Sequence, residues 1–145
     1  MSARMKVAFG CYAAAYLLFA GFAAIYLLRP QFMPYHAVAL GMRWEEVGRP
    51  FQVLILGFMR VIGGGLLAAA FIGAVLLLWP FRQGAPWARW AIPVHGLILG
   101  LASLWGTLSV QLNTPARSPW LAAAVGIFLL AAGGLLSISK EHPYS

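Results

Sequence analysis

Side chains able to do chemistry are few in this chain, and one histidine and two of the three glutamates lie between residues 29 and 60. The sequence has no aspartate, three glutamates, three histidines and one cysteine among its 145 residues. His36 and Glu46 are the one pair placed to act as acid and base. An ion pair between Arg43 and Glu46, three residues apart, explains the glutamate more simply than catalysis does.

Other catalytic and metal-binding arrangements are missing from the sequence. The three histidines, His36, His95 and His142, lack the short spacing of metal ligands, and Cys11 has no second cysteine to pair with. No GxSxG, P-loop or HExxH motif occurs. A haem would need a second axial histidine at the depth of His95. We therefore predict no catalytic residues, no metal and no cofactor, and we regard an enzyme as the less favoured reading.

Arg60 is the most unusual polar residue, because it follows the mostly apolar stretch 51–59. An arginine facing lipid at mid-bilayer costs about 2.5–3.5 kcal/mol or more. Arg60 therefore either reaches the membrane interface or points into the protein and pairs with Glu45 or Glu46. We adopt the inward pairing with Glu46 as a hypothesis, in which the two side chains form a buried ion pair.

The elements that must position these residues are apolar helices. The chain is 62% hydrophobic and 9% charged, whereas a soluble domain has about 25% charged residues. A helix of about 20 apolar residues crosses the hydrocarbon layer. Four stretches qualify: about 7–28, 53–81, 90–111 and 119–139. The predicted fold class is all-α, a polytopic membrane four-helix bundle formed by one domain over 1–145.

The first link is the longest, and it is predicted to contain a short amphipathic helix over about 34–47. Its apolar positions recur at helical spacing and its polar residues lie opposite, which is typical of a helix lying in the membrane interface. Such a helix either covers the bundle end or covers a pocket. In the second case the candidate ligand-binding residues are Tyr35, His36, Trp44, Glu46 and Arg60.

Small residues recur at four-residue spacing in two of the predicted spans. Such faces allow helices to approach closely, within one bundle or between subunits. The predicted packing positions are Gly63, Gly64, Gly65, Ala69, Gly73, Gly96 and Gly100.

Charge and topology are linked in this sequence. The net charge is +7, but the positive residues lie between apolar stretches, where they meet lipid headgroups rather than nucleic acid. Leaving out Arg60, five of them (Arg4, Lys6, Arg82, Arg89 and Lys140) fall on the side of the two termini, against four on the other side. We therefore predict that both termini lie in the cytoplasm.

Three stretches carry a resemblance to known proteins. The stretches Met33–His36, Trp44–Glu46 and Arg60–Gly65 (MPYH, WEE and RVIGGG) resemble small four-helix bacterial membrane proteins of uncharacterised function. The resemblance implies a bacterial inner-membrane location and the same four-span fold, and it implies no activity. Likeness to DoxX-like four-helix proteins rests on architecture alone.

Two functions remain after these exclusions. The first is a non-enzymatic accessory or scaffold subunit that packs against itself or a larger membrane complex through its Gly/Ala faces. The second is a binder of a small apolar ligand, a lipid or a quinone, beneath the first link. A filled core with an exposed Gly/Ala face favours the first, and a pocket that reaches Arg60 favours the second.

Overall fold

The computed structural model describes residues 1–138, and in them every long element is a helix. In order along the chain these are α1 (Ala3–Leu28), α2 (Pro34–Leu40), a 3-10 turn η1 (Trp44–Glu46), α3 (Arg49–Leu76), a π-helical turn η2 (Leu77–Phe81), α4 (Ala88–Asn113) and α5 (Trp120–Ile138). Four helices are long and apolar enough to span a membrane. The all-α fold class and the four spans are thus confirmed, and the chain is a multi-pass membrane protein. Ser139 and Lys140 lie outside the described residues.

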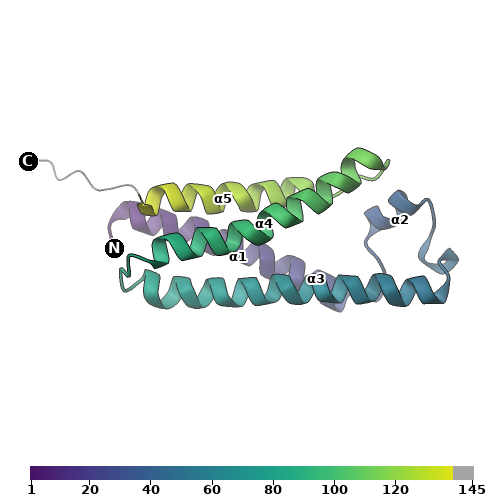
Figure 1. Ribbon diagram of the computed structural model, residues 1–145, viewed down its shortest axis with the longest axis horizontal. Coiled ribbons are helices and arrows are strands. Elements are labelled where there is room, and N and C mark those ends of the chain that lie inside the picture. The colour runs from purple at the N-terminus through teal and green to yellow at the C-terminus, as the bar shows by residue number, and fades with distance from the viewer. Residues whose placement is uncertain (139–145) are drawn as a thin grey trace, which may run out of the picture.

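Helix α1 lies at the centre of the bundle and packs along both α3 and α5, while α5 also packs along α4. Contacts between α3 and α4 are far fewer. Figure 1 shows why: the two helices lie close near their connecting turn and then diverge toward the end that carries α2. The bundle therefore has a closed end, beside the N-terminus, and a splayed end beside α2.

The turn between α3 and α4 sets the closed end. Pro80 lacks an N–H group, so the last turn of α3 widens into η2, and the Ala85 N–H donates to the Pro80 carbonyl. Gly84 has a φ of 79°, a left-handed conformation that suits glycine. Phe81, 1% exposed, is thereby turned into the core against Tyr12.

The predicted continuous helix over 34–47 is wrong. Helix α2 ends at Leu40 because Gly41 adopts the left-handed conformation, with a φ of 65°, and its N–H donates to the last carbonyls of the helix. The chain resumes helical structure only in the short turn η1. The apolar spacing that predicted one helix is shared by two short ones with a glycine between them.

Most of the predicted packing positions do contact neighbouring helices. A methyl group added to Gly63, Gly73, Gly96 or Gly100 would meet a side chain of another helix, and Ala69 is buried. Gly64 and Gly65 contact no neighbouring helix of the bundle, because both are exposed with nothing within 4 Å of the added carbon, so packing between subunits stays a prediction for them. In a helix of 3.6 residues per turn, only Gly63 of these three neighbours can face α1.

Two buried tyrosines hold the closed end together. The Tyr16 hydroxyl donates to the Ile92 carbonyl of α4 at 2.8 Å, and the Tyr12 hydroxyl lies 3.0 Å from Ser137 Oγ of α5. The glycines make room for these rings, since Gly73 lies against Tyr16 and Gly133 against Tyr12. Hydroxyls inside apolar helices need such partners, because lipid offers none.

Candidate functional site

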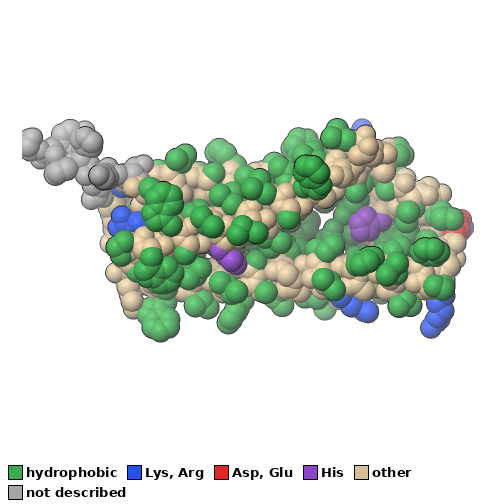
Figure 2. Space-filling model, viewed as in Figure 1, with side chains coloured by type: hydrophobic (Ala, Val, Ile, Leu, Met, Phe, Trp, Pro, Cys, Tyr) green, Lys and Arg blue, Asp and Glu red, His purple; other side chains and the backbone are tan. Residues whose placement is uncertain are grey.

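A cavity of about 750 Å³ occupies the splayed end, between α3 and α4. Leu18, Phe22 and Tyr26 of α1 line it, and Ala122 of α5 completes the wall. Residues 35, 36, 39 and 40 of α2 lie at its end. Figure 2 shows a hollow between the two diverging helices, on the side where α2 lies. We call this cavity the α3–α4 groove.

The groove exists because α4 and α5 present mainly small side chains to it. Ala102, Ser103 and Gly106 line it from α4, and Ala122 and Ala123 line it from α5. Gly65 of α3 also lines the groove, and no atom of another helix lies within 4 Å of a Cβ added to it. No large residue fills the space that the divergence of α3 and α4 leaves, so packing there stays below the usual density of a protein interior.

Apolar atoms form almost the whole groove wall, and no charged side chain lines it. Thr107 donates its hydroxyl to the Ser103 carbonyl of its own helix at 2.8 Å, so that group is already satisfied. Ser103 also lines the groove from α4, and the other polar side chains, Tyr26, Tyr35 and His36, belong to α2 and the end of α1. A ligand in the groove would therefore meet hydrocarbon along its length and hydrogen-bonding groups at one tip.

Tyr35 is the main polar group at that tip. Its hydroxyl lies 2.7 Å from the Tyr26 hydroxyl, which ties α2 to the end of α1. Burial raises the pKa of Tyr35, and the hydrogen bond with Tyr26 raises that pKa further. The phenol is therefore neutral and keeps a proton that it can donate.

His36 is neutral by its geometry. Its Nδ1 accepts the Met33 N–H at 3.3 Å, which closes the first turn of α2. An accepting Nδ1 carries no proton, so the neutral ring holds its proton on Nε2. Burial lowers the pKa of His36 and so also favours the neutral ring. The Tyr35 and His36 rings meet edge to face with centroids 4.2 Å apart.

A small hydrophobic cluster of its own holds the first link against the bundle. Its buried members are Tyr26, Phe32, Val47 and Met59, from α1, the link and α3. Trp44 packs edge to face on Phe32 with centroids 5.0 Å apart, and the Gln52 side chain donates to the Trp44 carbonyl at 2.8 Å. These contacts fix α2 over the end of the groove although α2 itself has only two turns.

The predicted site residues separate into two groups. Tyr35 and His36 line the groove. Trp44 supports the link without lining the groove, and Glu46 lies outside it.

The predicted Arg60–Glu46 pair is wrong. Glu46 instead accepts from the backbone N–H of Arg43 at 2.8 Å and from its guanidinium at 3.0 Å, and both hydrogen bonds hold the pKa of Glu46 below its usual range.

Arg60 is exposed on α3 and does not line the groove, although its neighbours Met59 and Val61 do. Helix α3 and η2 together run for 33 residues, more than the ~20 that cross the hydrocarbon layer. The excess length lets Arg60, the twelfth residue of α3, reach the membrane interface. Interfacial placement, the alternative left open by the sequence, fits this geometry.

Sequence reasoning missed most of the groove. Phe22 and Tyr26 on α1, together with Ser103, Gly106 and Thr107 on α4, line it without having been singled out. One signal was available: the third predicted span carries small and polar residues at 102, 103, 106 and 107, so that its second half has a face of small side chains. We interpreted helix faces made of small residues only as contact surfaces, whereas here the facing helix, α3, diverges from α4 and leaves a cavity.

Comparison with protein-family models, curated proteins and solved structures gives no match to this chain. The resemblance carried by the MPYH, WEE and RVIGGG stretches therefore stays a prediction, and the site is interpreted from its own geometry.

Proposed function

We propose that this protein binds an uncharged, chain-like apolar molecule, a lipid chain or an isoprenoid quinone, in the α3–α4 groove. The observation that carries the proposal is the groove itself: about 750 Å³, apolar, and lined by no charged side chain. Ligand sites in proteins commonly measure about 300–1,000 Å³ and combine an apolar wall with a few polar groups. The groove fits that description.

The surroundings of the groove favour a ligand taken from the membrane. Large apolar residues of α3 and α4 outside the groove, among them Phe71 and Ile98, are about 70% exposed. In a bilayer these side chains contact hydrocarbon, so the space between the two helices adjoins lipid rather than water. A long apolar molecule can then enter sideways without crossing an aqueous phase.

The polar tip favours a neutral headgroup. Tyr35 and His36 line the groove as neutral groups, and the exposed Arg43–Glu46 pair is not part of the wall. A carbonyl or hydroxyl can accept a hydrogen bond there, whereas a buried charge would find no partner of opposite sign. We therefore propose no catalytic step at this site.

Scaffolding through glycine faces is the second candidate. Gly57 and Gly64 lie seven residues apart on α3, and each has nothing within 4 Å of an added Cβ. That strip is free to receive a helix of a second copy or of a larger complex. We further propose the bacterial inner membrane as the location, with both termini in the cytoplasm, on the resemblance and the excess of positive residues beside the termini.

Two adjacent glycines allow a matched test. Gly65 and Gly64 are both exposed and open, but only Gly65 lines the groove. Gly65→Phe should fill the groove, while Gly64→Phe adds the same ring outside it. Native mass spectrometry of protein released from mild detergent should show an apolar molecule of defined mass on wild type and Gly64→Phe, and at least about tenfold less on Gly65→Phe.

The opposite pattern would favour scaffolding. Loss of a stoichiometric protein partner, or of a dimer, in Gly64→Phe with no defined small molecule on any variant would reject the ligand proposal.

A further inference from the structure

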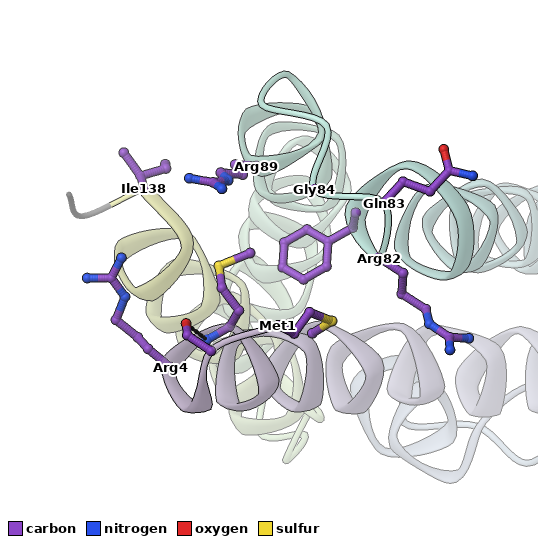
Figure 3. A pocket seen from close by; sticks show the side chains of 10 residues that line it. Met1, Arg4, Arg82, Gln83, Gly84, Arg89 and Ile138 are labelled. Carbon is purple, nitrogen blue, oxygen red and sulfur yellow. Dashed lines mark hydrogen bonds between the residues drawn. The ribbon is translucent and has the colours of Figure 1, made fainter. Parts of the chain in front are cut away.

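A second cavity, of about 660 Å³, lies at the closed end of the bundle. Three segments that are far apart in sequence line it: the start of α1, the link from η2 to α4, and Ile138 at the end of α5. Figure 3 shows these segments around it. Phe81 and Met5, both less than 10% exposed, form its apolar base.

Three arginines line this cavity. Arg4, Arg82 and Arg89 line it, one from each of α1, the link and α4, and Gln83 adds an amide donor. In Figure 3 the guanidinium groups of Arg4 and Arg89 lie on the side nearer Ile138, and that of Arg82 lies on the opposite side. The acidic residues among 1–138 are Glu45 and Glu46, both near α2 at the other end of the bundle. Arginines gathered around one cavity attract an anion.

Among the three arginines, Arg89 gives the clearest indication of a ligand. Its Nε atom is buried and has no hydrogen-bond partner among the described residues. A buried donor on a charged group is costly to leave unsatisfied. An anion that entered the cavity would supply the acceptor that Arg89 lacks.

We propose that this cavity binds a phosphoryl group. Arginine presents a planar fork of donors that matches phosphate oxygens, and several arginines around one cavity share the charge of one such group. The headgroup of an anionic phospholipid and a soluble phosphate compound have this chemistry in common. Exposed Trp79, Trp87 and Trp90 flank the same link, and tryptophans gather at the depth of lipid headgroups. The cavity thus lies where lipid phosphates are found.

The site is independent of the α3–α4 groove. The two cavities have no lining residue in common, and their walls differ in kind: one has three arginines and the other has no charged side chain. A phosphate-bearing lipid held at the closed end would leave the groove free for its own ligand.

The test uses the full chain in a neutral detergent. Binding of a short-chain phosphatidylglycerol, a short-chain phosphatidylcholine and inorganic phosphate is measured by native mass spectrometry and by the shift in unfolding temperature. Wild type should bind phosphatidylglycerol at least about tenfold more tightly than phosphatidylcholine. Arg89→Gln should weaken that binding about tenfold, as expected for losing a charge-assisted hydrogen bond, and Arg89→Lys should restore part of it.

Arg117→Gln is the matched control, because it removes the same charge from an exposed side chain in the link between α4 and α5, at the opposite end. It should bind phosphatidylglycerol as wild type does. Glu141 follows α5 in the sequence and lies outside the described residues, so Glu141→Gln is included; binding should persist in it. Inorganic phosphate binding as tightly as the lipid would assign the site to a soluble phosphate compound. Equal binding by wild type, Arg89→Gln and Arg117→Gln, or no preference over phosphatidylcholine, would overturn the proposal.

Discussion

The two ends of this bundle are built from the same kinds of residue and reach opposite outcomes. At the closed end, glycines on α3, α4 and α5 face aromatic or branched side chains of a neighbouring helix, and the rings of Tyr12 and Tyr16 fill the space. At the splayed end, Gly65 and Gly106 face no side chain within 4 Å, and a cavity results. A small residue thus indicates close packing only where a large one stands opposite it.

This contrast separates stability from function in the molecule. The closed end holds the larger buried core cluster and the tyrosine hydrogen bonds between helices. The splayed end lacks that filling and is held by the small cluster around Phe32 and Met59. Substitutions at the closed end should therefore act on unfolding, and those in the groove on ligand binding.

The largest effect is expected from Gly73→Ala. The added methyl would overlap the Tyr16 ring, which its hydrogen bond to the Ile92 carbonyl holds in place. Overpacking of this kind costs about 1–3 kcal/mol. Thermal unfolding in detergent should show a clear fall in midpoint for this variant. The matched Gly64→Ala, on the same helix with open space around it, should unfold at or slightly above the wild-type midpoint; equal losses in both would remove the distinction between the two ends.

A smaller effect is expected where the first link is held. Tyr35→Phe and Tyr26→Phe each remove the 2.7 Å hydrogen bond between the two hydroxyls, at a cost of about 1 kcal/mol each. The double variant should lose little more than either single one, because both changes break one interaction. Full additivity in chemical unfolding would show that the two hydroxyls act separately.

The sequence predicted the four spans because their length and apolarity depend on the membrane alone. It could not predict the groove, which depends on how far α3 and α4 diverge. It offered two partners for Glu46, and the structure has the local one, Arg43 three residues away, rather than Arg60. The helix over 34–47 was drawn too long because Gly41, in the left-handed conformation, leaves the apolar spacing intact while ending the helix. Local partners and backbone conformation decided these points, and periodicity shows neither.

A pH effect should arise at the splayed end from His36. Burial lowers its pKa below the ordinary 6.5, so the unfolded chain binds the proton first as the pH falls. Stability should therefore be unchanged above about pH 6.5 and fall below it. Protonation of Nδ1 would also break the bond from the Met33 N–H. Unfolding midpoints between pH 7.5 and 5 should drop less in His36→Gln than in wild type; identical slopes would exclude His36 as the source.

The smallest effect is expected from Arg60→Ala. Because Arg60 is exposed and outside the groove, its removal should change the free energy of unfolding by no more than about 0.5 kcal/mol. Ligand occupancy should also stay as in wild type. A large loss of stability would instead support the hypothesis of a buried ion pair between Arg60 and Glu46.

The most direct measurement maps where apolar molecules touch the protein. Full-length protein in bilayers that contain a photoactivatable, uncharged long-chain lipid is irradiated, and the adducts are located by mass spectrometry. Phe22 on the central helix α1 and Ser103 on α4 line the groove, whereas Leu67, Phe71 and Leu101 are exposed on outer faces. Lipid in the groove predicts adducts at both sets in wild type, with loss of the Phe22 and Ser103 adducts alone in Gly65→Phe. Adducts confined to the outer faces of wild type would contradict the account.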